Sequence, residues 1–373
     1  MGLALVQVAC AGGDACGTLH AGNADDCLRI NQVQVLGTHN SYHQQPTAAL
    51  RQALDSIAPD WEPEWWYTHR PLIEQLGALN IRQFELDVFA DPEGSHYLRP
   101  IGRRLEGAPP MLEDERMTHP GYKVLHVQDL DYRSSCPTLT VCLEQVRDWS
   151  LSNPRHLAVM ILVEVKDGVL EDSLGHEFTQ PVPVGALELD ALDAEILGVF
   201  GSEHLIMPDN VRGDYGSLDE AIQQRGWPTI GESRGKVLFA LDNTSAHRDE
   251  YLRHHPDLEA RVMFTSSPPG ERTAGFIKMN EAIDDGELIR SYVEQGYLVR
   301  TRSDIPLHEA RTGETTRREA ALGSGAQFVS TDYPQPSPFG SGYIVTLPQA
   351  QGRPARCNPV SAPPGCRAEW IIE

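Results

Sequence analysis

The sequence has no apolar run of about 18 residues, the length that a helix needs to cross a bilayer. Positive charge is also scarce, because 31 lysines and arginines stand against 53 aspartates and glutamates and leave a formal net charge of -22. Like-charge repulsion argues against nucleic acid or an anionic membrane as a lasting partner and leaves room for a bound cation. With 40% hydrophobic and 23% charged residues, the composition is that of a soluble globular protein.

The seven cysteines are an odd number, but six of them form pairs that are close in sequence. The pairs are Cys16 with Cys27, Cys136 with Cys142, and Cys357 with Cys366, which leaves Cys10 unpaired. None of these pairs has zinc-ligand spacing beside histidines, so disulfides formed in an oxidising compartment are favoured over reduced surface thiols. We therefore expect a secreted, extracellular protein.

The N-terminal segment 1–29 has a short apolar stretch without the basic residues that begin a signal peptide. It is interpreted as a weak or truncated signal sequence followed by a disulfide loop, so the case for export depends mainly on the cysteines. Residues 30–335 are expected to form one barrel domain, because (β/α)8 barrels of 250 residues and more occur as single units. Residues 336–373 are expected to be a C-terminal extension that contains a disulfide.

Eight strand-like runs follow one another along the chain, and the segments between them have the apolar spacing of amphipathic helices. The runs are 33–38, 81–90, 123–128, 157–166, 236–242, 276–280, 297–303 and 326–331. Eight strands that alternate with helices predict an α/β fold, a somewhat distorted (β/α)8 TIM-type barrel. In such a barrel the catalytic groups lie at the C-terminal ends of the strands, and polar residues fall at several of these ends.

A set of oxygen-bearing side chains indicates a metal site. Glu85 and Asp87 are two apart on a strand, so both carboxylates point to one face, where two buried anions would repel unless a cation neutralised them. Glu164 lies inside an apolar run, and Asn40 adds an amide oxygen. An all-oxygen set suits Ca²⁺ or Mg²⁺ better than zinc, and Ca²⁺ is favoured because it tolerates irregular geometry. The alternative for Glu85 and Asp87 is a solvated strand end.

Two histidines form the second candidate group. His39 and His126 could take up and return a proton, which is the pair of transfers needed to cleave a phosphodiester by attack of a neighbouring hydroxyl. The chain has 14 histidines, so two near strand ends could also arise by chance. His43, His69 and His119 are expected to be loop or packing residues.

Five motifs in order carry a resemblance to a known family. They are GTHNSYH, YTHRPLIEQL with IRQFELDVFAD, LHVQDLD, LVEVKD and AQFVSTDYP. Together they resemble the calcium-dependent phosphatidylinositol-specific phospholipase C family of bacteria and fungi, over residues 30–335. The wider superfamily also contains the eukaryotic phospholipases C and the glycerophosphodiester phosphodiesterases.

The resemblance implies a role for each candidate residue. His39 resembles the histidine that interacts with the attacking 2-hydroxyl of inositol and with the phosphate, and His126 the one that protonates the diacylglycerol oxygen. The residues that match the metal ligands are Asn40, Glu85, Asp87 and Glu164. The implied substrate is phosphatidylinositol or a related lipid, reached at a transient membrane interface, with a cyclic inositol phosphate as product and no obligate protein partner.

Three cationic residues are candidates for binding phosphate. Lys166 lies in a Glu-x-Lys pattern similar to that of the glycerophosphodiesterase branch, where the lysine faces the phosphate; the alternative is a surface lysine beside Asp167. Arg300 and Arg302 are two apart, and their guanidinium forks suit phosphate or inositol hydroxyls. Salt bridges to barrel carboxylates would explain the two arginines equally well.

Two other functions remain as alternatives. A glycerophosphodiester phosphodiesterase would share the barrel, the histidines and the carboxylates, but its first motif usually reads His-Arg-Gly where this chain has His39, Asn40 and Ser41. A non-catalytic calcium-binding barrel predicts the loss of a histidine or a carboxylate ligand, and none is missing here. Strand five ends in Asp242 where a phosphate-binding lysine would be expected, so the headgroup preference stays open.

Overall fold

The computed structural model of the chain describes residues 16–57, 62–171 and 175–373. Cys10 and residues 1–15, the larger part of the predicted signal remnant, lie outside the described residues. No helix in the described ranges is long and apolar enough to span a membrane.

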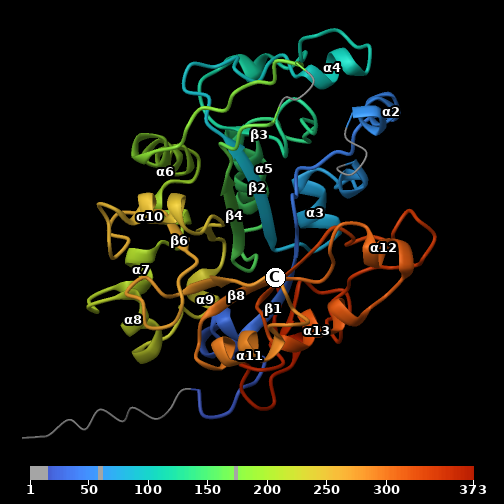
Figure 1. Ribbon diagram of the computed structural model, residues 1–373. Helices are drawn as coiled ribbons and strands as arrows, with labels where there is room; N and C mark the ends of the chain where they lie inside the picture. Colours follow the sequence, from blue (N-terminus) through green and yellow to red (C-terminus); the bar gives the residue numbers. More distant parts are fainter. Residues whose placement is uncertain (1–15, 58–61, 172–174) are drawn as a thin grey trace, which may run out of the picture.

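Eight parallel strands form the barrel at the centre of the molecule, with helices around them (Figure 1). In order around the barrel they are β6 (Met263–Thr265), β5 (Val237–Leu241), β4 (Val159–Val165), β2 (Gln83–Phe89), β1 (Val33–Thr38), β9 (Phe328–Thr331), β8 (Leu298–Arg302) and β7 (Phe276–Lys278). A single parallel bridge, Ser266 with Phe276, joins β6 to β7. The barrel is therefore nearly closed, as the α/β prediction required.

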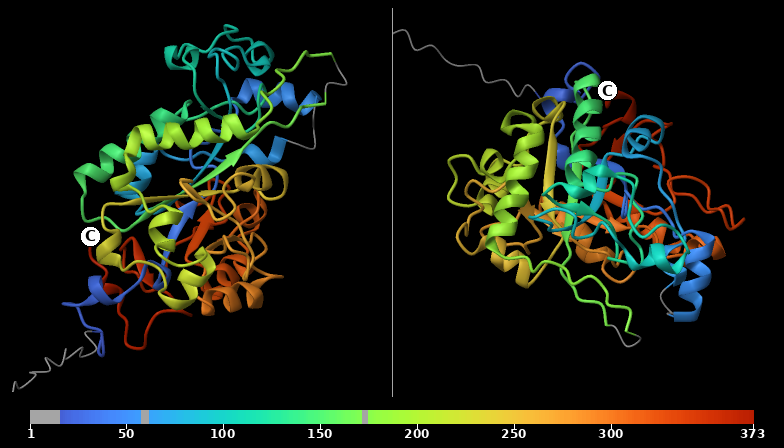
Figure 2. Two further views of the ribbon diagram at one scale, coloured as in Figure 1. Left: turned by 90° about the vertical axis from the view of Figure 1, so that its left-hand side faces the viewer. Right: turned by 90° about the horizontal axis from the view of Figure 1, so that it is seen from above.

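The helices differ widely in length, and they surround the strands in the views of Figure 2. They are α1 (Ala24–Cys27), α2 (Ala48–Ile57), α3 (Leu72–Ala78), α4 (Ile101–Leu105), α5 (Leu139–Ser152), α6 (Ala186–Phe200), α7 (Pro208–Arg212), α8 (Leu218–Gln224), α9 (Ile230–Ser233), α10 (Ala246–Leu252), α11 (Gly286–Glu294), α12 (His308–Thr312) and α13 (Thr316–Ser324). Short 3-10 turns cover Ile30–Gln32, Glu62–Trp65, Glu115–Thr118, Ser202–His204 and Ala368–Trp370. The longest helices, α5 and α6, pack against each other beside β4.

The prediction of one of the eight barrel strands is wrong. The run 123–128 forms only β3 (Lys123–Val124), which pairs antiparallel with the end of β2 and lies outside the barrel. The chain then turns tightly, because Val127 and Asp131 exchange backbone hydrogen bonds of 3.1 and 3.0 Å. The barrel strand that the sequence analysis missed is β6, whose three residues are too few to give a periodic signal.

The C-terminal extension contributes to the barrel wall. β10 (Ala355–Cys357) pairs antiparallel with β1, Val33 opposite Cys357, whereas β1 and β2 share only the pair Gly37 with Gln83. A Cβ atom on Gly37 would lie 1.8 Å from Gln83 Oε1, so only glycine permits this close approach. β10 thus covers the part of β1 that β2 does not reach.

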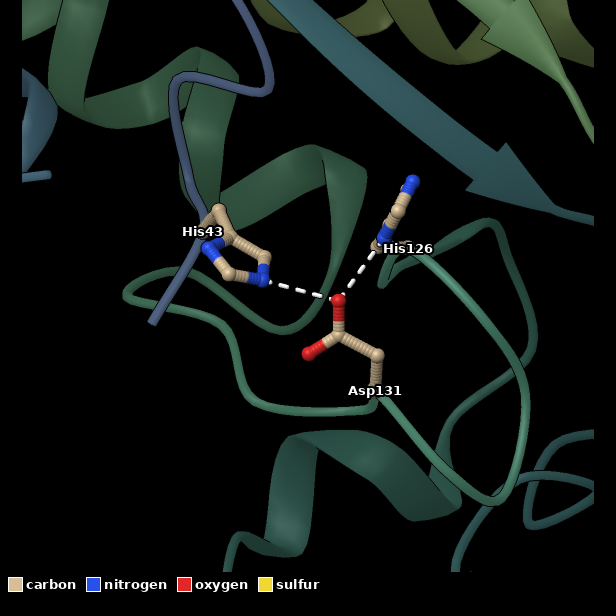
Figure 3. Close-up of side chains that lie close together, drawn as sticks. All are labelled: His43, His126 and Asp131. Atoms are coloured by element: carbon tan, nitrogen blue, oxygen red, sulfur yellow. Dashed lines mark hydrogen bonds and ion pairs between the residues drawn. The ribbon is translucent and has the colours of Figure 1, made fainter. Parts of the chain in front are cut away.

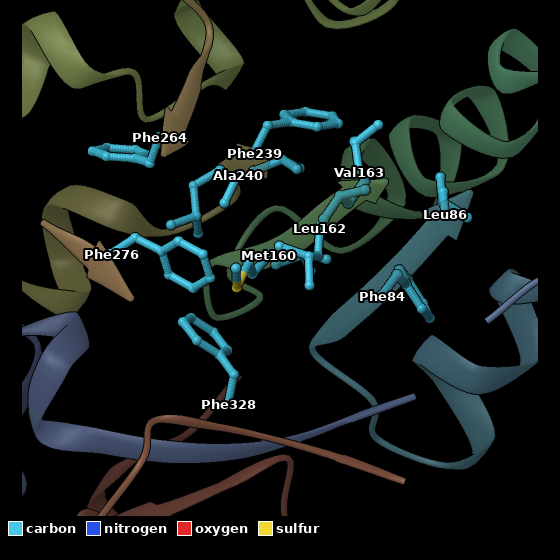
Figure 4. Close-up of a cluster of buried hydrophobic side chains, with 14 of the residues drawn as sticks. Phe84, Leu86, Met160, Leu162, Val163, Phe239, Ala240, Phe264, Phe276 and Phe328 are labelled. Atoms are coloured by element: carbon cyan, nitrogen blue, oxygen red, sulfur yellow. The ribbon is translucent and has the colours of Figure 1, made fainter. Parts of the chain in front are cut away.

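Apolar side chains from six barrel strands pack together in the core (Figure 4). They include Phe84, Leu86, Met160, Leu162, Val163, Phe239, Ala240, Phe264, Phe276 and Phe328. Parallel strands that are buried on both faces have nearly continuous apolar sequences, which explains why β4 reads VMILVEV.

All three predicted disulfides are present. They join Cys16 to Cys27, Cys136 to Cys142 and Cys357 to Cys366. The last one closes the loop that follows β10, so it holds this strand in place against β1.

The strand missed by the sequence analysis is expected to be essential for stability. Phe264 on β6 is fully buried and lies 5.3 Å from the Trp227 ring. We expect Phe264→Ala to lower the free energy of unfolding by about 3–5 kcal/mol, because it leaves a cavity in the core. Chemical denaturation measures the loss. Leu187→Ala on α6, at a side chain that is 79% exposed, is the control and should change stability by less than about 0.5 kcal/mol; equal losses would contradict the prediction.

Candidate active site

Most of the predicted site residues lie at the C-terminal ends of barrel strands, at one mouth of the barrel. His39 and Asn40 follow β1 directly, and Arg302 ends β8. His126 differs from the expectation, because it lies in the loop after β3 and not at the end of a barrel strand. The tight turn of this loop brings it to the site.

Glu85, Asp87 and Glu164 form a compact group of carboxylates. Asp87 on β2 and Glu164 on β4 are register partners in neighbouring parallel strands, so their side chains lie side by side. One oxygen from each of the three acids lies within 4.8 Å of the others. The prediction that these three acids come together is confirmed.

Burial makes this group of anions unstable without positive charge. It raises the pKa of Glu85 to about 8, an effect that Arg300 opposes and that Asp242 and Asp87 increase. It also raises the pKa of Asp87 to about 7, with Lys166 opposing and Glu164 adding to the rise. A bound divalent cation would oppose both shifts, because its charge stabilises the ionised carboxylates.

Asn40 lies in the loop after β1, where the backbone N–H of the next residue, Ser41, donates a 2.9 Å hydrogen bond to the backbone oxygen of Glu85. The backbone of Asn40 has φ 44°, a left-handed conformation that asparagine tolerates better than most residues. Its Nδ2 donates a 3.0 Å hydrogen bond to the hydroxyl of Tyr67, whereas the buried Oδ1 has no hydrogen-bond partner within the described ranges. Three carboxylates and an unpartnered amide oxygen are a donor set that fits a hard cation such as calcium.

His39 is held by a buried aspartate that the sequence analysis left without a role. Its Nδ1 lies 2.9 Å from Asp332 Oδ1, and its Nε2 lies 3.7 Å from Glu85 Oε1. Burial lowers the pKa of His39 well below the usual value, and Arg302 and Arg300 lower it further. The ring is therefore neutral near pH 7, the state in which a histidine can accept a proton. His69 Nε2 bonds the backbone oxygen of His39 at 2.8 Å.

His126 is held in a second histidine–aspartate arrangement (Figure 3). Its Nδ1 lies 2.7 Å from Asp131 Oδ2, and the same oxygen lies 2.8 Å from His43 Nε2. Burial raises the pKa of Asp131, but the two histidines lower it by more, so the net pKa is below the usual value. Asp131 is thus ionised, and it fixes the His126 ring so that Nε2 points away from Asp131.

His43 and Asp131 were not assigned a function from the sequence. His43 is a fully buried loop residue, as expected, but its ring also supports Asp131 and stacks on Tyr67 at 4.3 Å. The spacing of His126 and Asp131 in the LHVQDLD motif was a local signal, since a tight turn of that length brings both side chains together.

The three predicted phosphate-binding cations all contact carboxylates. Lys166 lies 2.9 Å from Glu164 and 3.2 Å from Asp87. Arg300 is buried and pairs with Glu85, and the Nη2 atom of Arg302 lies 3.2 Å from Asp332 Oδ2. The salt bridges considered for the arginines are therefore present, and Lys166 is not a plain surface lysine.

Strand five and strand seven add a pair that the sequence analysis did not predict. Asp242 follows β5, and Lys278 ends β7; the two side chains form an ion pair at the same mouth of the barrel. A lysine is therefore present beside Asp242, but it comes from β7 and not from strand five.

Comparison with known proteins agrees with this geometry. The sequence model of the Ca²⁺-dependent phosphoinositide phospholipase C family matches residues 28–359, which is most of the chain. The chain belongs to this family. It is therefore an enzyme of the phospholipase C class, a phosphoric diester hydrolase whose substrates are inositol phospholipids.

Solved structures show the same fold at low sequence identity. A calcium-dependent phosphoinositol-specific phospholipase C from Pseudomonas sp is 15% identical, with a TM-score of 0.52 over 90% of this chain and 96% of that one. A Ca²⁺-dependent phosphatidylinositol-specific phospholipase C from Streptomyces antibioticus is 18% identical, with a TM-score of 0.52 over 83% and 96%. No curated protein sequence matches this phospholipase C significantly.

The cluster of Glu85, Asp87 and Glu164 predicts where this phospholipase C binds calcium. We expect Asp87→Asn to weaken calcium binding at least about tenfold. Losing a residue that only supports the ligands costs about 10–100-fold in metal affinity, and losing a ligand should cost at least as much. Isothermal titration calorimetry measures the affinity. Asp242→Asn removes a buried acid from the neighbouring strand end, outside the group, and should have a much smaller effect. If Asp87→Asn bound calcium with wild-type affinity, Asp87 would not be a calcium ligand.

Proposed function

We propose that this phospholipase C cleaves phosphatidylinositol by attack of the inositol 2-hydroxyl on the phosphorus. The products are diacylglycerol and a cyclic inositol phosphate, which water can then open. The observation that supports this reaction is the presence of two histidines, each with its own aspartate, next to one group of oxygen ligands. A base, an acid and a site for a hard cation are what an intramolecular transfer of this kind requires.

His39 is the proposed general base. Its Nδ1 is bonded to Asp332, which leaves Nε2 to accept the proton of the attacking hydroxyl, and the lowered pKa of the His39 ring keeps this nitrogen unprotonated. When the ring takes up the proton, the nearby carboxylates of Asp332 and Glu85 stabilise its positive charge.

His126 is the proposed general acid. Protonated His126 donates from Nε2 to the glycerol oxygen as the ester bond breaks, so that diacylglycerol leaves as a neutral alcohol. The anionic Asp131, 2.7 Å from Nδ1, stabilises the protonated ring before this transfer and holds its orientation. His43 is a positioning residue that acts through Asp131.

The proposed metal ligands are the oxygens of Asn40, Glu85, Asp87 and Glu164. Calcium is favoured over magnesium, since this donor set is irregular and rich in protein oxygens, whereas magnesium prefers an octahedral site that keeps several waters. When bound there, calcium lowers the pKa of the 2-hydroxyl and offsets the charge of the phosphate.

Cationic side chains would hold the phosphate. Arg302 is the better placed arginine, because its buried Nε has no hydrogen-bond partner among the described residues. The Nε and both Nη atoms of Arg300 donate to Ser330, Asn280 and Glu85, so its contribution to phosphate binding would require it to leave one of them. Lys166 would reach the phosphate from the opposite wall of the site.

The setting of the enzyme is also proposed. Three disulfides support secretion, and residues 30–335 would form the catalytic barrel, flanked by the segments 1–29 and 336–373. We infer only transient contact with the membrane, because the net charge of -22 opposes lasting contact with anionic lipid. The reaction needs no protein partner and no nucleic acid.

Phosphorus NMR tests the reaction directly. With phosphatidylinositol micelles, the purified protein should produce a cyclic inositol phosphate signal in calcium and none in excess chelator, because cyclic product arises only by attack of the 2-hydroxyl. If the lipid stays intact under both conditions while glycerophosphoinositol is cleaved, the glycerophosphodiesterase alternative takes precedence. Loss of neither compound would favour the non-catalytic barrel.

The leaving group tests the role of His126. His126→Ala should reduce cleavage of the natural alkoxide ester at least about 100-fold, the lower end of the contribution of general acid catalysis, but reduce cleavage of an aryl or thiol ester much less, because these leaving groups need no proton. Steady-state kinetics on both substrates measure the difference. His119→Ala, at an exposed histidine, should change neither rate, and equal losses for His126→Ala on both substrates would remove it from the acid role.

A further inference from the structure

Lys166 lies among the carboxylates where the proposed metal ion would be held. Its Nζ lies 2.9 Å from Glu164 Oε1 and 3.2 Å from Asp87 Oδ2, and both acids belong to the compact group. The third acid, Glu85, is paired with Arg300. Each acid of the group therefore already has a cationic side chain as its partner.

Lys166 and a calcium ion would compete for these oxygens. Calcium contacts its six to eight ligand oxygens at about 2.3–2.6 Å, so an ion bound by Asp87 and Glu164 would lie against the ammonium group and be repelled by it. Lys166 has a flexible four-carbon stem and a side chain that is 25% exposed. Its ammonium group is therefore free to swing away from the carboxylates when another cation replaces it.

We propose that Lys166 is a built-in competitor of calcium that turns to the substrate phosphate when the metal displaces it. This inference rests on the calcium site and the reaction proposed above. In the metal-free enzyme the ammonium group neutralises Asp87 and Glu164 and is not available to an anion. In the calcium-bound enzyme the same group is released beside the phosphate position, so metal and phosphate each strengthen the binding of the other.

Calorimetric calcium titration of Lys166→Met tests the competition without measuring activity. Methionine keeps an unbranched side chain of similar length but carries no charge, so calcium no longer has to displace a bound cation. We expect the affinity for calcium to rise at least about tenfold, within the usual range of coupling between sites. Melting in chelator shows whether the variant is folded.

Lys278→Met is the matched control. It removes the same charge from the same mouth of the barrel, but Lys278 is paired with Asp242 and not with the three-carboxylate group. A rise in affinity as large as that of Lys166→Met would overturn the inference, because it would show an effect of net charge alone. Unchanged affinity in Lys166→Met would overturn the displacement and leave the calcium site intact. No calcium binding by either the wild type or Lys166→Met would overturn both proposals.

The wild-type protein allows a second test that needs no variant. The chain has only four lysines, Lys123, Lys166, Lys236 and Lys278, so acetylation by acetic anhydride can be followed at each one by mass spectrometry. Saturating calcium should increase the labelling rate of Lys166 severalfold, because an ammonium group held between two carboxylates is a poor nucleophile. Lys236 lies directly before β5, at the opposite end of that strand from the site, and its rate should not change. An unchanged rate at Lys166 would overturn the displacement.

Discussion

The close approach of Glu85, Asp87 and Glu164 is the constraint on which the rest of the site depends. Parallel pairing of β2 and β4 places the three acids on one face at the barrel mouth, where burial disfavours their charges. The cations around them answer this constraint: Arg300 pairs with one acid, and Lys166 pairs with the other two. The same crowding of anions makes the site attractive to calcium.

The two histidines are positioned by a different means. Each contacts a buried aspartate through Nδ1, but Asp332 comes from the end of β9 and Asp131 from the turn after β3. The two pairs therefore come to the proposed site from separate elements. His39 also has a distinct electrostatic environment, because burial, and after it the neighbouring Arg302 and Arg300, lower its pKa. Unequal environments of this kind can give two similar side chains different roles, which supports the base and acid roles proposed for His39 and His126.

The sequence predicted seven of the eight barrel strands, and the three acids that it grouped lie close together in the structure. Apolar runs and the alternation of side chains on a strand are local properties, so the faces of β2 and β4 could be read directly. The run 123–128 was wrongly predicted as a barrel strand, because its alternating pattern resembles a strand, whereas the chain turns back between Val127 and Asp131. The three residues of β6 gave no signal, since strands this short become strands only through pairing with their neighbours.

The sequence alone determined the class of fold, the disulfide pairs and the list of candidate site residues, because periodicity, spacing and side-chain type are local properties of the chain. Only the tertiary structure decided which charge meets which. Lys278 contacts Asp242, which is 36 residues away in the sequence, and Arg300 contacts Glu85, which is 215 residues away. Such pairs depend on barrel closure and strand register, which arise from the packing of the whole chain.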